Sequence, residues 1–334
     1  MLYMGDGSID AEACVQLAAR APLFRTKERI LRRVRLPELT AYILGKLGHL
    51  LVVALLRSLS ILPYPWVARL GSALGAGLYA LPGRRKHIVL VNLRLCFPDK
   101  SGPECDELAR EHFRHVVRSY LERGIQWFGS ARSIRNIVEI ESEIDLDEEN
   151  PPPTIFMGFH FVGIEMGCML YSMQSPIAAL YTHMSNTRLC DLAKRQRGRF
   201  GAEMIERSIS ARKIVSLLHE GKPVMLAADM DHGIENSVFV PFFGVPACTL
   251  TSISRLAKVG RARVVPFVTE VLPDFKGYRL KVFAPLTDFP TGSDTNDARR
   301  MNAFLETQIL RFPAQYYWVH RRFKHRPQGM PAVY

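Results

Sequence analysis

The pattern of apolar and polar positions in the first third of the chain indicates helices. Residues 39–62, "LTAYILGKLGHLLVVALLRSLSIL", form a long apolar stretch that Lys46, His49 and Arg57 interrupt. A second apolar piece, "WVARLGSALGAGLYALP", follows it and ends at "GRRKH". Further on, apolar residues recur at helical spacing with charges on the opposite face, which predicts a helix over about 103–128.

From residue 154 onwards, short apolar runs alternate with amphipathic segments. "TIFMG" predicts a buried strand, and a helix is predicted after it, over about 162–173. "SARKIVSLLHEG" predicts an amphipathic helix that ends at Gly221. Further buried strands are predicted at "IAALY", "PVMLAAD", "ARVVPFVTEVL" and "YRLKVF". This alternation predicts an α/β fold in which a largely parallel sheet is sandwiched by helices.

Composition divides the chain into three expected parts. Residues 1–36 form a basic leader, residues 37–83 form apolar helices that associate with a membrane, and residues 84–334 form the main folded domain. Within that domain, seven acidic residues fall in the stretch 139–149, before three prolines. They indicate a solvated strand edge and loop, and a role in orienting an anionic substrate is the alternative.

The formal net charge of +12 is spread along the chain and predicts an acidic partner, which is nucleic acid, anionic lipid or an acidic protein. The six cysteines form no CxxC pair, so we expect reduced thiols and no zinc site. The first twenty residues lack the basic and apolar regions of a signal peptide.

Cationic residues flank both ends of the apolar region, at "RTKERILRRVR" and "GRRKH". A single crossing would leave one of these flanks on the side that the positive-inside rule disfavours. A segment lying in the cytoplasmic leaflet keeps all the cations near anionic headgroups. Membrane attachment is therefore expected, with a single span and a monotopic anchor both open, and a buried core helix is the alternative.

A histidine and a glutamate stand where an ordinary buried helix would have neither. In "FHFVGIEMG", His160 falls at the turn between the predicted strand and helix, and Glu165 falls in the first turns of that helix. Ligands of open α/β sheets bind at such strand ends. Helical side chains lean towards the N-terminus, so we expect Glu165 to reach back to the imidazole. A carboxylate on one ring nitrogen favours proton uptake by the other, as a general base requires.

Other motifs narrow the chemistry. The sequence contains no G-x-S-x-G elbow, no HExxH and no P-loop. Asp229 and Asp231 end a predicted strand, where two acids either bind a metal or, more often, order a loop or hold a cation. Cations gather in "KRQRGRFG", which includes Arg197 and Arg199, and with aromatic residues in "YYWVHRRFKHRP". The second segment suits phosphorylated lipid as well as nucleic acid, and because no nucleic-acid motif occurs we expect no nucleic-acid partner.

Several blocks taken together resemble one family, the late acyltransferases of lipid A biosynthesis in Gram-negative bacteria. The blocks are "LPYPWVARLGSALG", "NLRLCFPD", "HFVGIE", "ADMDHGIENSVFVPFFGVPA" and "YWVHRRFKHRPQGMP", and they cover the chain from about residue 40 to its end. Their order and spacing are more specific than any one of them. The pattern is nearer to the lauroyl-type branch than to the myristoyl-type branch.

The resemblance implies a membrane-bound enzyme at the cytoplasmic face of the bacterial inner membrane, with a catalytic domain over 84–334. Acyl carrier protein would donate a fatty acyl chain, and a hydroxyacyl chain on a Kdo-bearing lipid A precursor would accept it, with membrane lipids as further partners. No metal or other cofactor is implied. The family's H-x4-[D/E] motif matches His160 and Glu165, which makes them the catalytic dyad.

The substrate-binding residues follow from the same resemblance and from the cationic blocks. They are Arg197, Arg199, Asp229, Asp231, Arg321 and Arg322. Two departures from the family leave questions open, because the leader is longer than usual and "HFVGIE" stands where many relatives have "HFGNWE". An acyltransferase acting on another glycolipid or phospholipid remains an alternative, and so does a non-catalytic membrane protein that binds anionic lipid.

Overall fold

The computed structural model describes residues 36–209 and 211–334, and the chain divides into two units at Leu55/Leu56. The central sheet and its helices belong to the second unit. Its strands are β1 (Val138–Ser142), β2 (Thr154–Gly158), β3 (Ala178–Tyr181), β4 (Glu203–Glu206), β5 (Val224–Ala227), β6 (Ser237–Phe242), β7 (Val245–Leu250), β8 (Arg263–Val271) and β9 (Tyr278–Val282). The predicted basic leader, residues 1–36, lies almost entirely outside the described residues.

The helices account for most of the remaining chain. They are α3 (Leu36–Ile61), α4 (Tyr64–Ala80), α5 (Arg84–Cys96), α6 (Gly102–Phe128), α7 (Ala131–Arg135), α8 (Ile164–Ser172), α9 (Thr187–Arg197), α10 (Ala211–His219), α11 (Ser252–Gly260) and α12 (Asp294–Arg311). Among the described residues, no helix is both long enough and apolar enough to cross a membrane.

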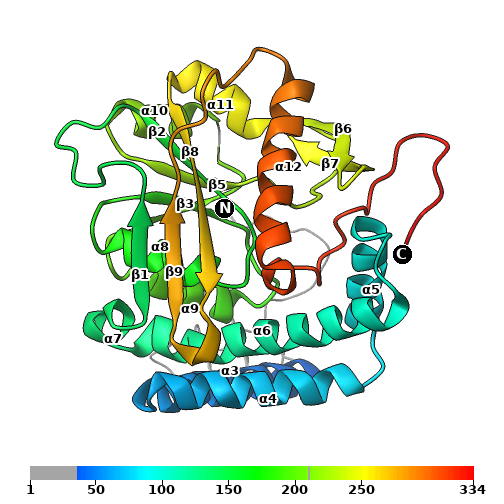
Figure 1. The fold of residues 1–334 in the computed structure, drawn as a ribbon. Coiled ribbons are helices and arrows are strands. Elements are labelled where there is room, and N and C mark those ends of the chain that lie inside the picture. Colours follow the sequence, from blue (N-terminus) through cyan, green and yellow to red (C-terminus); the bar gives the residue numbers. More distant parts are fainter. Residues whose placement is uncertain (1–35, 210) are drawn as a thin grey trace. The chain divides into compact units, whose positions relative to one another are not determined.

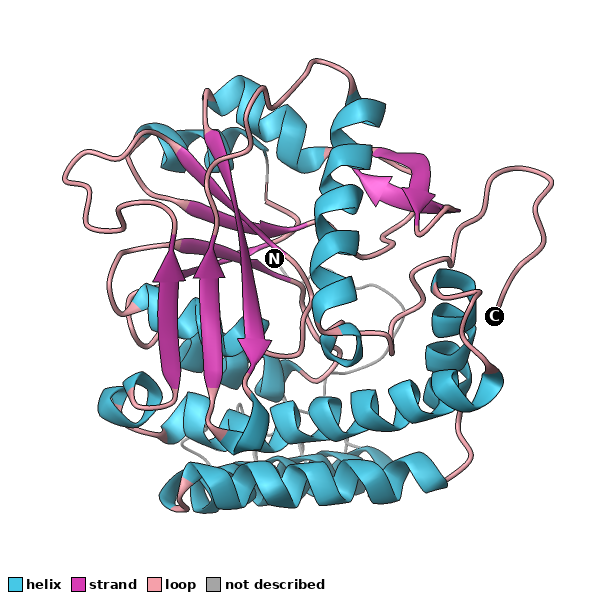
Figure 2. Ribbon diagram, viewed as in Figure 1, coloured by secondary structure: helices cyan, strands magenta, loops and turns pink. Residues whose placement is uncertain are grey.

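The main sheet has the strand order β1-β9-β8-β2-β5-β3-β4. Strands β8, β2, β5, β3 and β4 are parallel, β9 is antiparallel to β8, and β1 is parallel to β9. Figures 1 and 2 show helices on the faces of this sheet and the hairpin β6–β7 set apart from it beside α12. The predicted α/β fold with a mostly parallel sheet flanked by helices is confirmed.

The apolar pattern located most of the central elements. The predicted strand "TIFMG" is β2, whose five residues are all buried, and the predicted helix over 103–128 is α6. A capping box explains the sharp start of α6, because the Ser101 hydroxyl and the Glu104 carboxylate satisfy each other's backbone amides. The acidic stretch contains the edge strand β1 and the loop after it, as expected, with Glu139 and Glu141 paired to Arg279 and Lys281 of β9.

Helix α4 lies along α6, as Figure 1 shows, and two glycines permit the close approach. A Cβ atom at Gly71 would lie 2.5 Å from the Cα of Arg118, and one at Gly75 would lie 2.4 Å from the carbonyl oxygen of Phe113. The first two glycines of "GSALGAG", Gly71 and Gly75, therefore serve helix packing. The structure places α4 in the same compact unit as the sheet.

Candidate active site

His160 and Asp229 form a hydrogen-bonded pair at the carboxyl edge of the sheet. His160 follows β2 and Asp229 follows β5, and these strands are parallel neighbours, so the residues after them meet. The Nδ1 atom of His160 lies 2.7 Å from Oδ1 of Asp229, and the backbone N–H of His160 donates to Oδ2 at 3.0 Å. The first contact holds the ring and the second holds the backbone that carries it, so Nε2 is the ring nitrogen left for proton transfer.

The environment keeps Asp229 ionised. Its side chain is buried, which raises the pKa of the carboxyl, but the charge of His160 and the two hydrogen bonds outweigh burial and hold the pKa well below its usual range. A buried carboxylate on Nδ1 selects the tautomer with a free Nε2 lone pair and stabilises the imidazolium that forms when Nε2 takes a proton.

The C-terminal segment supports the loop that carries the histidine. Tyr317 donates its backbone N–H to the carbonyl of His160 at 2.8 Å, and a β-bridge joins Phe161 to Tyr316. The cationic and aromatic block over 316–327 therefore packs around the His160 loop, a role that its composition alone did not indicate.

Glu165 differs from the expectation that it reaches back to the imidazole. Its carboxylate accepts hydrogen bonds from the Trp127 indole at 2.8 Å and from the Arg197 guanidinium at 3.1 and 3.0 Å, and Arg123 lies 3.7 Å away. Because Glu165 stands in the first turn of α8, facing α6 and α9, these helices supply its partners. The carboxylate bonded to His160 is thus Asp229.

Two arginines decide the charge state of Glu165. Burial raises the pKa of this carboxyl, but Arg197 and Arg123 outweigh it and lower the pKa to about 2. Glu165 is therefore a largely buried anion that ties α8 to α9. Both His160 and Glu165 nevertheless line the same cavity, so Glu165 remains within the site.

Asp231 repeats the geometry of Asp229 with a different histidine. The backbone N–H of His325 donates to Asp231 Oδ2 at 2.7 Å, and His325 Nδ1 lies 2.6 Å from Oδ1. The sequence left two roles open for these acids, metal binding and the ordering of a loop. In the structure each acid holds a loop that carries a histidine. Within residues 36–209 and 211–334, no cluster of His, Cys, Asp and Glu side chains is arranged to hold a metal ion.

The remaining predicted substrate-binding arginines occupy structural positions or lie away from the cavity. Arg199 donates to the carbonyls of Gln126 and Gly129 at 2.8 and 2.7 Å, at the C-terminus of α6. Arg322 is 0% exposed and bonds to Cys248, Thr249 and Asn302 inside the protein. Arg321 is partly exposed and does not line the cavity. A fully buried guanidinium bonded to internal carbonyl and hydroxyl oxygens is poorly placed to grip a substrate phosphate, and the contacts of Arg199 hold the end of α6. Substrate binding by Arg199 and Arg322 stays a prediction that these contacts disfavour.

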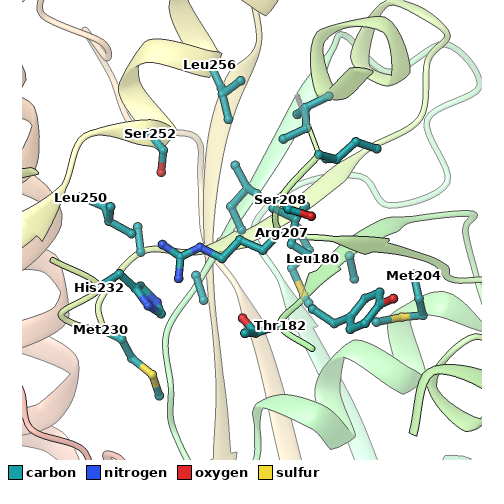
Figure 3. A pocket seen from close by; sticks show the side chains of 18 of the residues that line it. Leu180, Thr182, Met204, Arg207, Ser208, Met230, His232, Leu250, Ser252 and Leu256 are labelled. Carbon is teal, nitrogen blue, oxygen red and sulfur yellow. The ribbon is translucent and has the colours of Figure 1, made fainter. Parts of the chain in front are cut away.

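The site opens into a cavity of about 1360 Å³ with a largely apolar lining. Figure 3 shows leucines and methionines on its walls, with Arg207 and His232 reaching between them. The apolar residues lining it include Ile164, Met169, Leu180, Met204, Ile214, Leu250 and Leu256. Sequence reasoning missed Arg207 and His232, although Arg207 comes directly after β4 and His232 lies in the loop after β5, at the carboxyl edge of the sheet.

The fold and the site together define a class of protein. A histidine backed by a buried carboxylate, at the carboxyl edge of a parallel sheet and beside a large, mainly apolar cavity, suits an enzyme that activates a hydroxyl next to an alkyl chain. The family model of the bacterial lipid A biosynthesis acyltransferases matches residues 39–325. The chain belongs to this family and is an acyltransferase.

Individual relatives agree with the family match. The lipid A biosynthesis lauroyltransferase of Escherichia coli K12 is 35% identical over 277 residues, covering 82% of this chain and 90% of that protein. A lipid A biosynthesis acyltransferase of Haemophilus influenzae is 33% identical, covering 84% of this chain and 92% of the relative. The lipid A biosynthesis myristoyltransferase of Escherichia coli K12 is 31% identical, covering 79% and 82%.

Proposed function

We propose that this enzyme moves a fatty acyl chain from acyl carrier protein to a hydroxyl group on a hydroxyacyl chain of a Kdo-bearing lipid A precursor. The observation that carries the proposal is the His160–Asp229 pair at the wall of the apolar cavity. A base is needed to activate a hydroxyl, and an apolar cavity is needed to hold an alkyl chain beside it. The relatives named as lipid A acyltransferases support the choice of acceptor.

The proposed reaction uses His160 as base and then as acid. Nε2 removes the proton of the acceptor hydroxyl as its oxygen attacks the thioester carbonyl, while Asp229 stabilises the imidazolium. The tetrahedral intermediate collapses, the carbon–sulfur bond breaks, and the imidazolium returns the proton to the thiolate. The products are an ester and a free carrier thiol. A thioester is already activated, so the proposed step needs no metal or other cofactor.

Glu165 has a supporting role in this proposal. As an anion held by Arg197, it fixes the start of α8, the helix that directly follows the His160 loop. Glu165 also lines the cavity that His160 lines. In this proposal Glu165 of the H-x4-[D/E] motif is a positioning residue, which holds the helix beside the His160 loop in place.

An exposed apolar stripe on α4 supports attachment to the membrane. Leu62 and then every fourth residue through α4, namely Trp66, Leu70, Leu74 and Leu78, are exposed large apolar side chains, and Trp66 is 70% exposed. Residues four apart lie on one face of a helix, opposite the face packed on α6. Such a stripe suits burial at the depth of the headgroups and upper acyl chains.

Cations next to this stripe fit an anionic leaflet. Helix α5 begins with Arg84, Arg85 and Lys86 and has no acid in its first turn. Cations at a helix N-terminus oppose the helix dipole, and although Arg85 and Lys86 donate to the carbonyls of Val319 and Tyr79, no acid neutralises them through a salt bridge among the described residues. Attraction to anionic lipid headgroups at the cytoplasmic face of the inner membrane would account for their presence there.

Mass spectrometry of lipid A tests the proposal. Lipid A from cells with and without the gene is compared, and the purified enzyme is given acyl carrier protein loaded with acyl chains of several lengths. We expect a mass gain of one acyl chain when the enzyme is present, and the preferred length identifies the donor. An unchanged lipid A profile, with no product from the purified enzyme, would refute the proposed acceptor.

A further inference from the structure

Arg207 stands at the same edge of the sheet as His160. Strands β2, β5, β3 and β4 are consecutive and parallel, so the residues that follow them share one edge. Arg207 comes directly after β4, and its backbone N–H donates to the carbonyl of Tyr181 at 2.8 Å. This bond extends the pairing of β3 with β4 by one residue and fixes the point from which the side chain leaves the strand.

The side chain of Arg207 reaches into the cavity. Figure 3 shows its guanidinium passing between apolar walls towards His232, and both residues line the cavity together with His160. The charge of Arg207 acts on His232, as does that of His160. His232 is therefore close enough to Arg207 and to His160 for their charges to affect its pKa.

Among the described residues, the guanidinium of Arg207 has no hydrogen bond or ion pair. Two other arginines that line the cavity are neutralised, since Arg197 is bonded to Glu165 and Arg255 to Asp294. Arg207 is exposed overall; partial burial lowers the pKa of its guanidinium, and among the described residues no acid pairs with it. A solvent-accessible guanidinium on the wall of the cavity, with no counter-ion among the described residues, is available to bind an anionic group of a ligand.

His232 does not supply that counter-ion. Burial, followed by the charges of Arg207 and His160, lowers the pKa of His232 to about 4, so its ring is neutral near pH 7. A neutral imidazole offers one N–H donor beside the guanidinium fork. The two side chains together present donors and a positive charge to the interior of the cavity.

We propose that Arg207 binds a phosphate group of a substrate and so sets the position of the reacting groups relative to His160. This inference rests on the proposed function, because it concerns the substrates of that reaction. A planar guanidinium holds two phosphate oxygens at once and stays charged at any working pH. The phosphate has two possible sources, the headgroup of the acceptor and the phosphodiester arm that carries the acyl chain on the donor.

The test combines a residue change with a substrate change. Initial rates are measured in neutral detergent micelles for the wild type, Arg207→Ala and Arg207→Lys, with acceptor and donor varied separately. Arg135→Ala, on α7 outside the cavity, is the control that removes the same charge. We expect Arg207→Ala to raise KM for one substrate by about 10- to 100-fold with little change in kcat, and Arg207→Lys to restore part of it.

Substrates that lack the phosphate show which of the two substrates supplies the phosphate that Arg207 binds. Acceptor lacking a phosphate is compared with intact acceptor, and acyl-pantetheine with acyl-phosphopantetheine. If Arg207 contacts the missing group, its removal costs the wild type affinity but costs Arg207→Ala nothing further. Additive losses for both substrates would overturn the inference. A loss confined to kcat would also overturn it, because it would place Arg207 at the oxyanion.

A binding readout separates this inference from the proposed function. Inorganic phosphate should raise the melting temperature of the wild type and of Arg135→Ala more than that of Arg207→Ala. If phosphate binds through Arg207 but no acyl transfer occurs, the proposed reaction fails and the phosphate site stands. Equal stabilisation of all three proteins would count against the site, whatever the activity.

Discussion

Replacing Glu165 by glutamine tests how the site is held together. The carboxylate is 15% exposed and bonds to Arg197 and Trp127. Its pKa of about 2, against an ordinary 4.5, corresponds to about 3 kcal/mol in favour of the ionised form. Because the pKa is lowered on folding, this contribution is present above pH 4.5 and is lost as the pH falls through about 2.

The glutamine variant should therefore be less stable near pH 7. It keeps the shape of the side chain but leaves the half-buried guanidinium of Arg197 without a counter-charge, so we expect a loss of about 3 kcal/mol. For a unit of this size that corresponds to roughly 5–10 °C in melting temperature. Thermal unfolding in neutral detergent, followed by near-ultraviolet circular dichroism, measures it.

The double variant Glu165→Gln/Arg197→Met separates stability from chemistry. Removing both charges should recover part of the lost stability, because no uncompensated cation remains. If Glu165 acts only by positioning α8, transfer activity should recover with it. Recovered stability without recovered activity would show that Glu165 acts on the substrate or on His160. An unchanged melting temperature in Glu165→Gln would refute the estimate from its contacts.

Lowering the pH from 6.5 towards 4 should destabilise the protein, because burial lowers the pKa of His112 to about 4 and the unfolded chain then binds a proton that the folded chain does not. Melting temperatures over this range should fall less steeply for His112→Asn, and identical slopes would refute the link. Arg199→Met should lower stability by on the order of 2 kcal/mol through two lost carbonyl hydrogen bonds, while a raised KM with unchanged stability would return it to the substrate site. Trp66→Ser with Leu74→Ser should reduce flotation with anionic liposomes by tenfold or more without lowering the melting temperature, and undiminished flotation would contradict a docking role for α4.

The sequence pattern predicted those helices and strands that depend on interactions between residues close together in the chain. The continuous apolar run of β2 and the capping residues of α6 are readable within a few positions, and the structure has both. The same holds for His160 at a strand end, since a strand followed by a helix places a turn there. In a parallel sheet the carboxyl ends of the strands lie at one edge, and this is the edge that carries the site.

The pairings inside the site depend on residues far apart in the chain. Asp229 lies 69 positions from His160, and only the adjacency of β5 to β2 brings them together, whereas Glu165 drew attention because it was near in sequence. Arg322 stands in a cationic run that suggests a binding surface, and no local signal reveals its complete burial. Arg207 follows a four-residue strand, too short for its apolar pattern to be recognised.

The central claim is that His160, oriented by Asp229, removes the proton of the acceptor hydroxyl. Single-turnover transfer from acyl carrier protein, measured with purified wild type, His160→Ala and Asp229→Asn, tests it most directly. The asparagine keeps the shape but removes the charge that selects the tautomer, so we expect both variants to lose about 10³-fold or more in rate while remaining folded and bound to micelles. Transfer within about tenfold of the wild type by a folded His160→Ala would contradict the account.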